Sequence, residues 1–342
     1  MPASENLSRR KFFARAAALG GAVVTPGTSG CGAGARGAAT APEVTPVSRI
    51  DAHQLFWTYS AENYSWIDPQ SAVARDFAPD DLRPALAAAG MQGTVLVEAR
   101  SHATETDHLL GIAAEADFVR GIVGWLPLMD PGVEGLLDRY AGNPKLRGLR
   151  HAIAAEADPE FMFRADFNRG LGLLAARKLR FDLLLVPGLL SRAPRLVDQH
   201  PNQIFVLDHF AKPSIRDQEL EPWRKDFIEL SRRPNVYCKV SGLVNEADLQ
   251  HWKPSDLRPY LDVALEAFTP QRLLFGSDWP MCLLATTYAG WFQTARDWLA
   301  QLSLGEQDRI LGGNAVEAYA LADHAQSRSA QPATSGDRIL AG

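Results

Sequence analysis

The sequence predicts an α/β fold, a single (β/α)8 barrel (TIM barrel), over residues 46–322. Short apolar runs alternate with helix-like segments, and polar residues end nearly every run, as expected of buried parallel strands. Roughly eight such pairs fill a length close to the ~250 residues typical of this barrel. A doubly wound open sheet is the alternative, which is disfavoured because no glycine-rich phosphate-binding turn follows the first run.

The runs that contain the predicted strands are seven to ten residues long and rich in leucine and β-branched residues. They lie within 48–54, 93–99, 119–128, 146–153, 180–186, 203–209, 236–242 and 272–278. The predicted helices often open with proline, aspartate, serine or threonine and close near glycine or proline, as capping preferences require. They lie at 79–90, 104–117, 131–142, 167–178, 255–268 and 291–302.

Residues 1–45 resemble a twin-arginine export signal followed by a linker. Arg9 and Arg10 precede a weakly apolar stretch that is too short to span a membrane. A basic amphipathic helix is the alternative. Removal is expected after "AGA" at 33–35 or before Cys31, where a lipid anchor would attach, although Thr28 stands where a lipoprotein signal has leucine. We expect an exported protein, periplasmic or membrane-anchored and facing outside the cytoplasm.

Composition narrows the function classes. The net charge of -5 and the absence of a basic stripe argue against a nucleic-acid partner. Cys238 and Cys282 are predicted to be small apolar core residues, not a disulfide. Residues 323–342 are polar and aperiodic, which predicts a disordered tail.

Catalytic groups of such barrels lie at the C-terminal ends of the strands. The polar residues there are His53, Glu98, Arg100, Trp125, Asp130, Arg150, His151, Asp208, His209, Lys212, Lys239, Ser241 and Asp278. The fifth strand ends in "VPG" and is predicted to offer no titratable group. Arg150 and His151 are adjacent, so only one points inward, and we favour Arg150 because its fork suits a substrate carboxylate or hydroxyl cluster.

Several motifs resemble the amidohydrolase superfamily, specifically its amidohydrolase-2 branch of lactone hydrolases. They are "IDAHQLFW", "YSWI", "GLRHAI", "VLDHFAKP", "CKVSGL", "FGSDWPMC" and "GGNA" at 312–315. Together they cover nearly the whole chain after residue 46. The resemblance implies a hydrolase on a TIM barrel.

The resemblance also implies roles for individual residues. Asp278 would be the catalytic base that activates water, and His53 and His209 would line the same pocket as catalytic residues. Arg150 and Lys239 would hold or polarise the substrate. The departure is Leu55, where the family normally has a second histidine that helps to ligate a divalent metal.

The expected cofactor is therefore none or one weakly held divalent metal, zinc or manganese. His53, His209 and Asp278 are the ligands that remain, and three protein ligands are the minimum for catalytic zinc. A lactone carbonyl is more reactive than an amide, so a carboxylate base with hydrogen-bonding groups on the carbonyl oxygen can suffice.

Other residues keep two interpretations. Glu98 is either a second acid or the partner of a cation, and Lys212 is expected to form a structural ion pair. Trp279, with Trp57 and Trp66, forms either an apolar wall for a ring-shaped substrate or plain core.

The leading prediction is a hydrolase that opens a small lactone or related cyclic ester, with a small-molecule substrate as its partner. The alternatives are a metal-dependent amidohydrolase or decarboxylase on the same fold, and a ligand-binding homologue without activity. Asp278 argues against the last of these.

Overall fold

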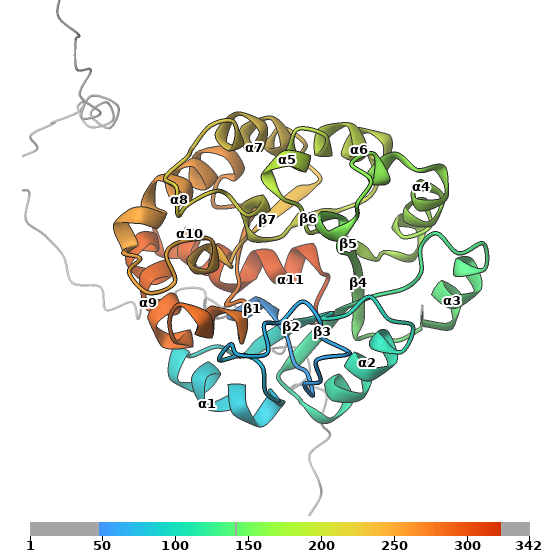
Figure 1. Cartoon of the computed structure of the whole chain (residues 1–342), viewed down its shortest axis with the longest axis horizontal. Helices are drawn as coiled ribbons and strands as arrows, with labels where there is room; N and C mark the ends of the chain where they lie inside the picture. Colours follow the sequence, from blue (N-terminus) through green and yellow to red (C-terminus); the bar gives the residue numbers. More distant parts are fainter. Residues whose placement is uncertain (1–47, 141, 323–342) are drawn as a thin grey trace, which may run out of the picture. The chain divides into compact units, whose positions relative to one another are not determined.

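The computed structural model describes residues 48–140 and 142–322, which form an eight-stranded parallel barrel (Figure 1). The strands pair in sequence order. They are β1 (Ile50–Gln54), β2 (Gly93–Val97), β3 (Val119–Gly124), β4 (Leu146–His151), β5 (Arg180–Leu183), β6 (Phe205–Leu207), β7 (Val236–Val240) and β8 (Leu273–Phe275). An isolated bridge between Gln54 and Trp279 joins the ends of β1 and β8, and the Leu55 amide donates to the Trp279 carbonyl at 2.8 Å. The predicted fold class is confirmed.

Most helices surround the strands on the outside of the ring, whereas the last described helix lies across its centre (Figure 1). The helices are α1 (Pro79–Ala89), α2 (Glu105–Glu115), α3 (Val133–Tyr140), α4 (Ala165–Gly172), α5 (Pro187–Leu190), α6 (Ala193–Gln199), α7 (Trp223–Ser231), α8 (Pro254–Phe268), α9 (Tyr288–Leu299), α10 (Leu304–Asp308) and α11 (Asn314–Ala318). Six of them correspond to the predicted helices. Cys238 and Cys282 are buried and unpaired in this part of the chain, as predicted for core residues.

Two apolar clusters build the core. The larger one fills the layer between strands and helices, where leucine and phenylalanine side chains of the strands meet the inner faces of the helices. The smaller one lies inside the barrel and brings Val95, Val97 and Leu274 against α11 and Tyr319. The barrel interior is therefore closed at one end by apolar packing against the last described helix, which leaves the other end for polar groups.

An irregularity in β1 turns His53 toward the barrel axis. Ala52 already packs in the inner cluster, so strict alternation would point His53 outward. The pairing of β1 with β2 shifts between Asp51 and Gln54, and His53 lies against Lys239 inside the barrel. Asp51 accepts hydrogen bonds from the amides of His53 and Ser277 and thereby holds this bend.

The predicted export signal, the lipid anchor at Cys31 and the disordered tail lie outside the described residues, and all three stay predictions. Within the residues that the structure describes, no helix is long and apolar enough to cross a membrane.

We predict that Gly170→Ala destabilises the barrel. A Cβ on Gly170 of α4 would collide with the backbone of Leu128, and a backbone cannot move aside cheaply. The expected loss is about 1–3 kcal/mol in urea unfolding. Gly135→Ala in α3 is the matched control, because open space surrounds that position. Gly135→Ala should raise the free energy of unfolding by about 0.5–1 kcal/mol. Equal effects of the two substitutions would contradict the close packing of Gly170.

Candidate active site

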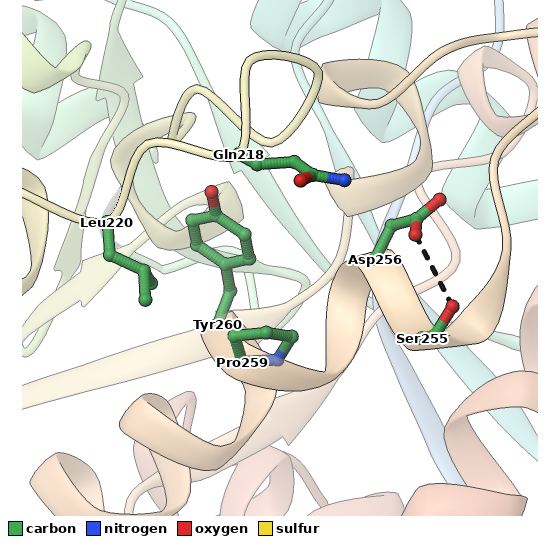
Figure 2. Close-up of a pocket in the computed structure, with 6 residues that line it drawn as sticks. All are labelled: Gln218, Leu220, Ser255, Asp256, Pro259 and Tyr260. Carbon is green, nitrogen blue, oxygen red and sulfur yellow. Dashed lines mark hydrogen bonds between the residues drawn. The ribbon is translucent and has the colours of Figure 1, made fainter.

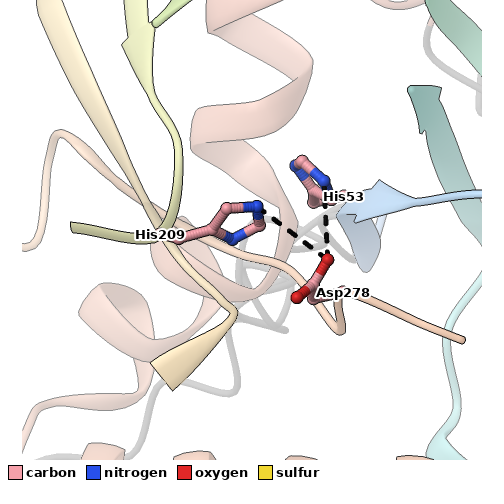
Figure 3. A group of neighbouring side chains, drawn as sticks. All are labelled: His53, His209 and Asp278. Atoms are coloured by element: carbon pink, nitrogen blue, oxygen red, sulfur yellow. Dashed lines mark ion pairs between the residues drawn. The ribbon is translucent and has the colours of Figure 1, made fainter. Parts of the chain in front are cut away.

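Three of the predicted side chains meet at the C-terminal ends of β1, β6 and β8 (Figure 3). Asp278 Oδ1 lies 3.7 Å from His53 Nε2 and 3.9 Å from His209 Nε2. The two imidazole rings meet edge to face with their centroids 4.4 Å apart. All three side chains are buried, so a ligand oxygen between them would be largely shielded from bulk water.

Asp278 occupies a tight exit from β8. Its backbone is left-handed, with φ of 55°, and its amide donates to the His53 carbonyl at 2.9 Å. The Asn245 side-chain amide donates to Oδ2 at 2.9 Å, which leaves Oδ1 facing the histidines. Burial raises the pKa of Asp278 to about 7, although the positive charges of Lys212 and Arg150 oppose the rise. A carboxyl with this pKa suits proton transfer near neutral pH.

Burial favours the neutral form of both histidines. Burial, followed by the charge of Lys239, lowers the pKa of His53 to about 3. Burial also lowers the pKa of His209 well below its ordinary value, and its Nδ1 lies 2.9 Å from Ser241 Oγ. Gly242 makes room for the His209 ring, because a Cβ there would approach Nδ1 to 2.5 Å and its φ is 71°. A glycine is required at this position.

A layer of charged side chains lies in the barrel beneath these three residues. Lys239 is fully buried and forms ion pairs with Asp182 at 2.5 Å and Asp208 at 2.9 Å. Tyr319 donates its hydroxyl hydrogen to Asp182, whose two carboxylate oxygens are each 2.9 Å away. The prediction that the fifth strand offers no titratable group is therefore wrong. Asp182 lies within β5 rather than after it, where its polar side chain is balanced by Lys239.

Arg150 and Glu98 belong to the same layer. The Arg150 guanidinium donates to the Glu98 carboxylate at 2.7 Å and to Asp208 at 3.0 Å, and it also contacts the Glu98 carbonyl oxygen. Glu98 is thus the partner of a cation, which is one of its two predicted interpretations. Arg150 points inward, whereas His151 stacks on Phe161 and pairs with Glu156 at 2.6 Å. Direct contact of Arg150, Glu98 or Lys239 with substrate stays a prediction.

The predicted aromatic wall divides between core and surface. Trp279 is buried and meets Phe56 and Phe77 edge to face, with centroids 5.8 and 5.1 Å apart. Trp57 is buried as well, whereas Trp66 is half-exposed and donates to the Ala99 carbonyl. Substrate contact by Trp279 stays a prediction.

Leu55 and Lys212 lie at the edge of the site. Leu55 is buried in the large apolar cluster, so no ligand atom replaces the histidine that the motif lacks. Lys212 pairs with Glu246 at 2.9 Å, as expected of a structural ion pair.

Sequence reasoning missed Asp182, Tyr319 and Asn245 as members of the site. The available signal was a single acidic residue inside the apolar run "RFDLLLV", since a lone buried carboxylate requires a partner. Tyr319 and Asn245 gave no local signal, because each reaches the site through the tertiary fold.

A pocket of about 250 Å³ lies apart from these residues, between the chain around Gln218 and Leu220 and the start of α8 (Figure 2). Ser255, Asp256, Pro259 and Tyr260 complete its lining. None of the three converging residues lines it, so we do not assign the chemistry to this pocket.

The three converging residues also fit a single divalent cation. Their ligand atoms all lie within 4.8 Å of one another, and His53 Nε2 is a buried polar atom without a hydrogen-bond partner among the described residues. Two imidazole nitrogens and a carboxylate oxygen form a known zinc donor set, at the three-ligand minimum.

Residues 50–321 match the family model described as amidohydrolase. The chain belongs to the amidohydrolase family. It is 40% identical over 292 residues to L-fucono-1,5-lactonase of Burkholderia multivorans, covering 82% of this chain and 98% of that protein. A similar relative, L-fucono-1,5-lactonase of Burkholderia ambifaria, is 35% identical over 79% of this chain and 95% of its own length.

A solved structure supports the same assignment. An amidohydrolase from Burkholderia multivorans with bound zinc has a TM-score of 0.77 and 40% identity, covering 80% of this chain and all of that one. Family and relatives together show that this amidohydrolase is a hydrolase, as predicted.

We predict a pH-dependent stability for Asp278→Asn, measured by urea unfolding of chelator-treated protein. Because the pKa of Asp278 is raised to about 7 in the folded state, its stabilising contribution is full below pH ~4 and is lost as pH rises through 7. The asparagine at position 278 cannot ionise. The free energy of unfolding of the variant should therefore increase relative to that of the wild type between about pH 4 and 8. The gain is on the order of 1.4 kcal/mol per unit of pKa shift. A difference that does not change with pH would contradict the raised pKa.

Proposed function

We propose that this amidohydrolase opens a sugar lactone, a six-membered 1,5-lactone in the first instance, by adding water at the carbonyl carbon. The observation that carries the proposal is the approach of one buried carboxylate oxygen, Asp278 Oδ1, to the Nε2 atoms of His53 and His209. The similarity to two L-fucono-1,5-lactonases supports the substrate class.

The proposed reaction begins with Asp278 taking a proton from water. The water oxygen attacks the lactone carbonyl carbon, and the negative charge that develops on the carbonyl oxygen is stabilised by hydrogen bonds from the imidazoles. The tetrahedral intermediate then collapses, the bond between the carbonyl carbon and the ring oxygen breaks, and the ring oxygen receives the proton from Asp278. The product is a hydroxy acid, and Asp278 is again ionised for the next turnover.

A divalent cation, when bound, would be held by His53, His209 and Asp278 and would polarise a carbonyl or lower the pKa of bound water. We propose that turnover does not require it. Leu55 stands where one metal ligand is expected. A lactone is also reactive enough for water to attack it with the help of a carboxylate base and two hydrogen-bond donors. The charged side chains beneath the site also supply a fixed electric field without a metal ion.

Asp278→Asn should lower kcat on sugar lactones by about 10²–10⁴-fold, because asparagine cannot accept the proton from water. The assay uses purified protein with a panel of sugar lactones, lactones from aromatic compounds and simple esters. Asp80→Asn, at a solvent-exposed aspartate on α1, is the matched control and should leave the rate unchanged. Equal rates for the wild type and Asp278→Asn would remove Asp278 from catalysis. Binding without turnover of any compound would favour a binding protein.

Removal of metal should leave the lactonase rate within about twofold of the untreated protein, since the groups that activate water belong to the chain. The measurement combines elemental analysis with rates before and after dialysis against a chelator. Stoichiometric zinc or manganese, together with a rate that is lost on chelation and regained on addition of that metal, would overturn metal independence and leave the hydrolytic assignment in place.

A further inference from the structure

We infer that Lys239 is a positioning residue that fixes the hydrogen of His53 on Nε2. In this state His53 donates a hydrogen bond to the lactone carbonyl oxygen and is a poor ligand for a metal. The donor role rests on the proposed function. The position of the hydrogen does not, because it follows from contacts inside the barrel.

The first step concerns the contact between the two side chains. Lys239 Nζ lies 3.1 Å from His53 Nδ1, and both side chains are buried. An ammonium group has hydrogens to donate and no lone pair to accept with, so Nδ1 must be the acceptor. A neutral imidazole with an unprotonated Nδ1 carries its hydrogen on Nε2.

The second step concerns the competing partner of Nδ1. Asp208 Oδ1 lies 3.4 Å from His53 Nδ1, beyond the usual range for an N–H···O hydrogen bond. The same oxygen lies 2.9 Å from Lys239 Nζ. Asp208 Oδ1 pairs with the ammonium group by charge but has no hydrogen-bond partner among the described residues. Of the two contacts of His53 Nδ1, the one with Lys239 at 3.1 Å is the shorter.

The third step concerns how firmly Lys239 is held. Asp182 contacts its ammonium from the other side at 2.5 Å, and Tyr319 fixes Asp182 in turn. The sequence of contacts from Tyr319 through Asp182 and Lys239 to His53 is wholly buried. Lys239 consequently has no solvent-exposed conformation that preserves its two ion pairs, and its donation to Nδ1 is preorganised.

The fourth step concerns the free nitrogen. His53 Nε2 has no hydrogen-bond partner among the described residues, and its distance of 3.7 Å from Asp278 Oδ1 is too long for a direct bond. An unpaired buried N–H is costly. A carbonyl oxygen of the substrate, bound beside the water that Asp278 activates, would satisfy it.

The same hydrogen opposes metal binding. A cation at Nε2 needs the lone pair of that nitrogen, so the hydrogen would have to move to Nδ1. There it would face the Lys239 ammonium across 3.1 Å. This geometry explains why His53, although it occupies a metal-site position, is a hydrogen-bond donor in this chain.

Nitrogen-15 NMR of chelator-treated wild-type protein tests the hydrogen position directly. Labelled histidine should show an unprotonated Nδ1 and a protonated Nε2 for His53, with the signal identified by its loss in His53→Gln. A protonated Nδ1 on His53 would overturn the inference. This result does not depend on lactonase activity, so it is distinguishable from failure of the proposed function.

A pair of variants tests the role of Lys239. Asp182→Asn/Lys239→Met removes one buried charge of each sign, and Asp182→Asn alone is the matched control that retains Lys239. In the double variant, we expect the His53 hydrogen to move to Nδ1, toward Asp208, and zinc affinity measured by calorimetry to rise at least about tenfold over the control. Unchanged zinc affinity and an unchanged tautomer would overturn the role of Lys239. If the double variant does not fold, the spectrum of Asp182→Asn decides: an unprotonated Nδ1 on His53 supports the role of the retained Lys239, and a protonated Nδ1 overturns it.

Discussion

The buried layer beneath the active site depends first on the ion pairs of Lys239. Its ammonium group lies between two carboxylates and one imidazole, with no contact to water. Removing it would leave Asp182 without an opposite charge in a medium of low dielectric constant, where an uncompensated ion is strongly destabilising. Arg150 plays the parallel part for Glu98 and Asp208. Burial raises the pKa of Glu98 and Asp182, and the two cations oppose this rise, whereas the pKa of Asp208 lies well below its ordinary value because it pairs with both cations.

The supporting residues and the proposed catalytic residues therefore lie at different levels along the barrel axis. Valine and leucine side chains with Tyr319 close one end, the charged layer fills the middle, and His53, His209 and Asp278 occupy the other end. Each level constrains the next, because Tyr319 orders Asp182 and Asp182 orders Lys239. The groups that meet the substrate in the proposed reaction thus lie at one end, and the contacts that hold them in place lie in the two lower levels.

The barrel and three of its catalytic candidates were predictable from the sequence, because strand and helix periodicities are local and the polar ends of strands share one face. The charged layer was harder to predict. Asp182 lies inside an apolar strand, and its significance depends on Lys239, 57 residues later. Simple alternation of side chains along a strand also does not predict the direction of the His53 side chain, because a register shift in β1 sets it. Arg150 and Trp279 were correctly placed near strand ends, but their neighbours, not their positions, decide what they contact.

Tyr319 follows α11, near the end of the described chain, and yet it holds a carboxylate at the centre of the barrel. During synthesis, strands β1 to β8 emerge before this residue does. Until Tyr319 docks, Asp182 lacks one of its two partners and the inner apolar cluster lacks its closing side chain. The electrostatics of the active site are therefore completed only after Tyr319 has been made and has docked, so the eight strands alone do not complete them.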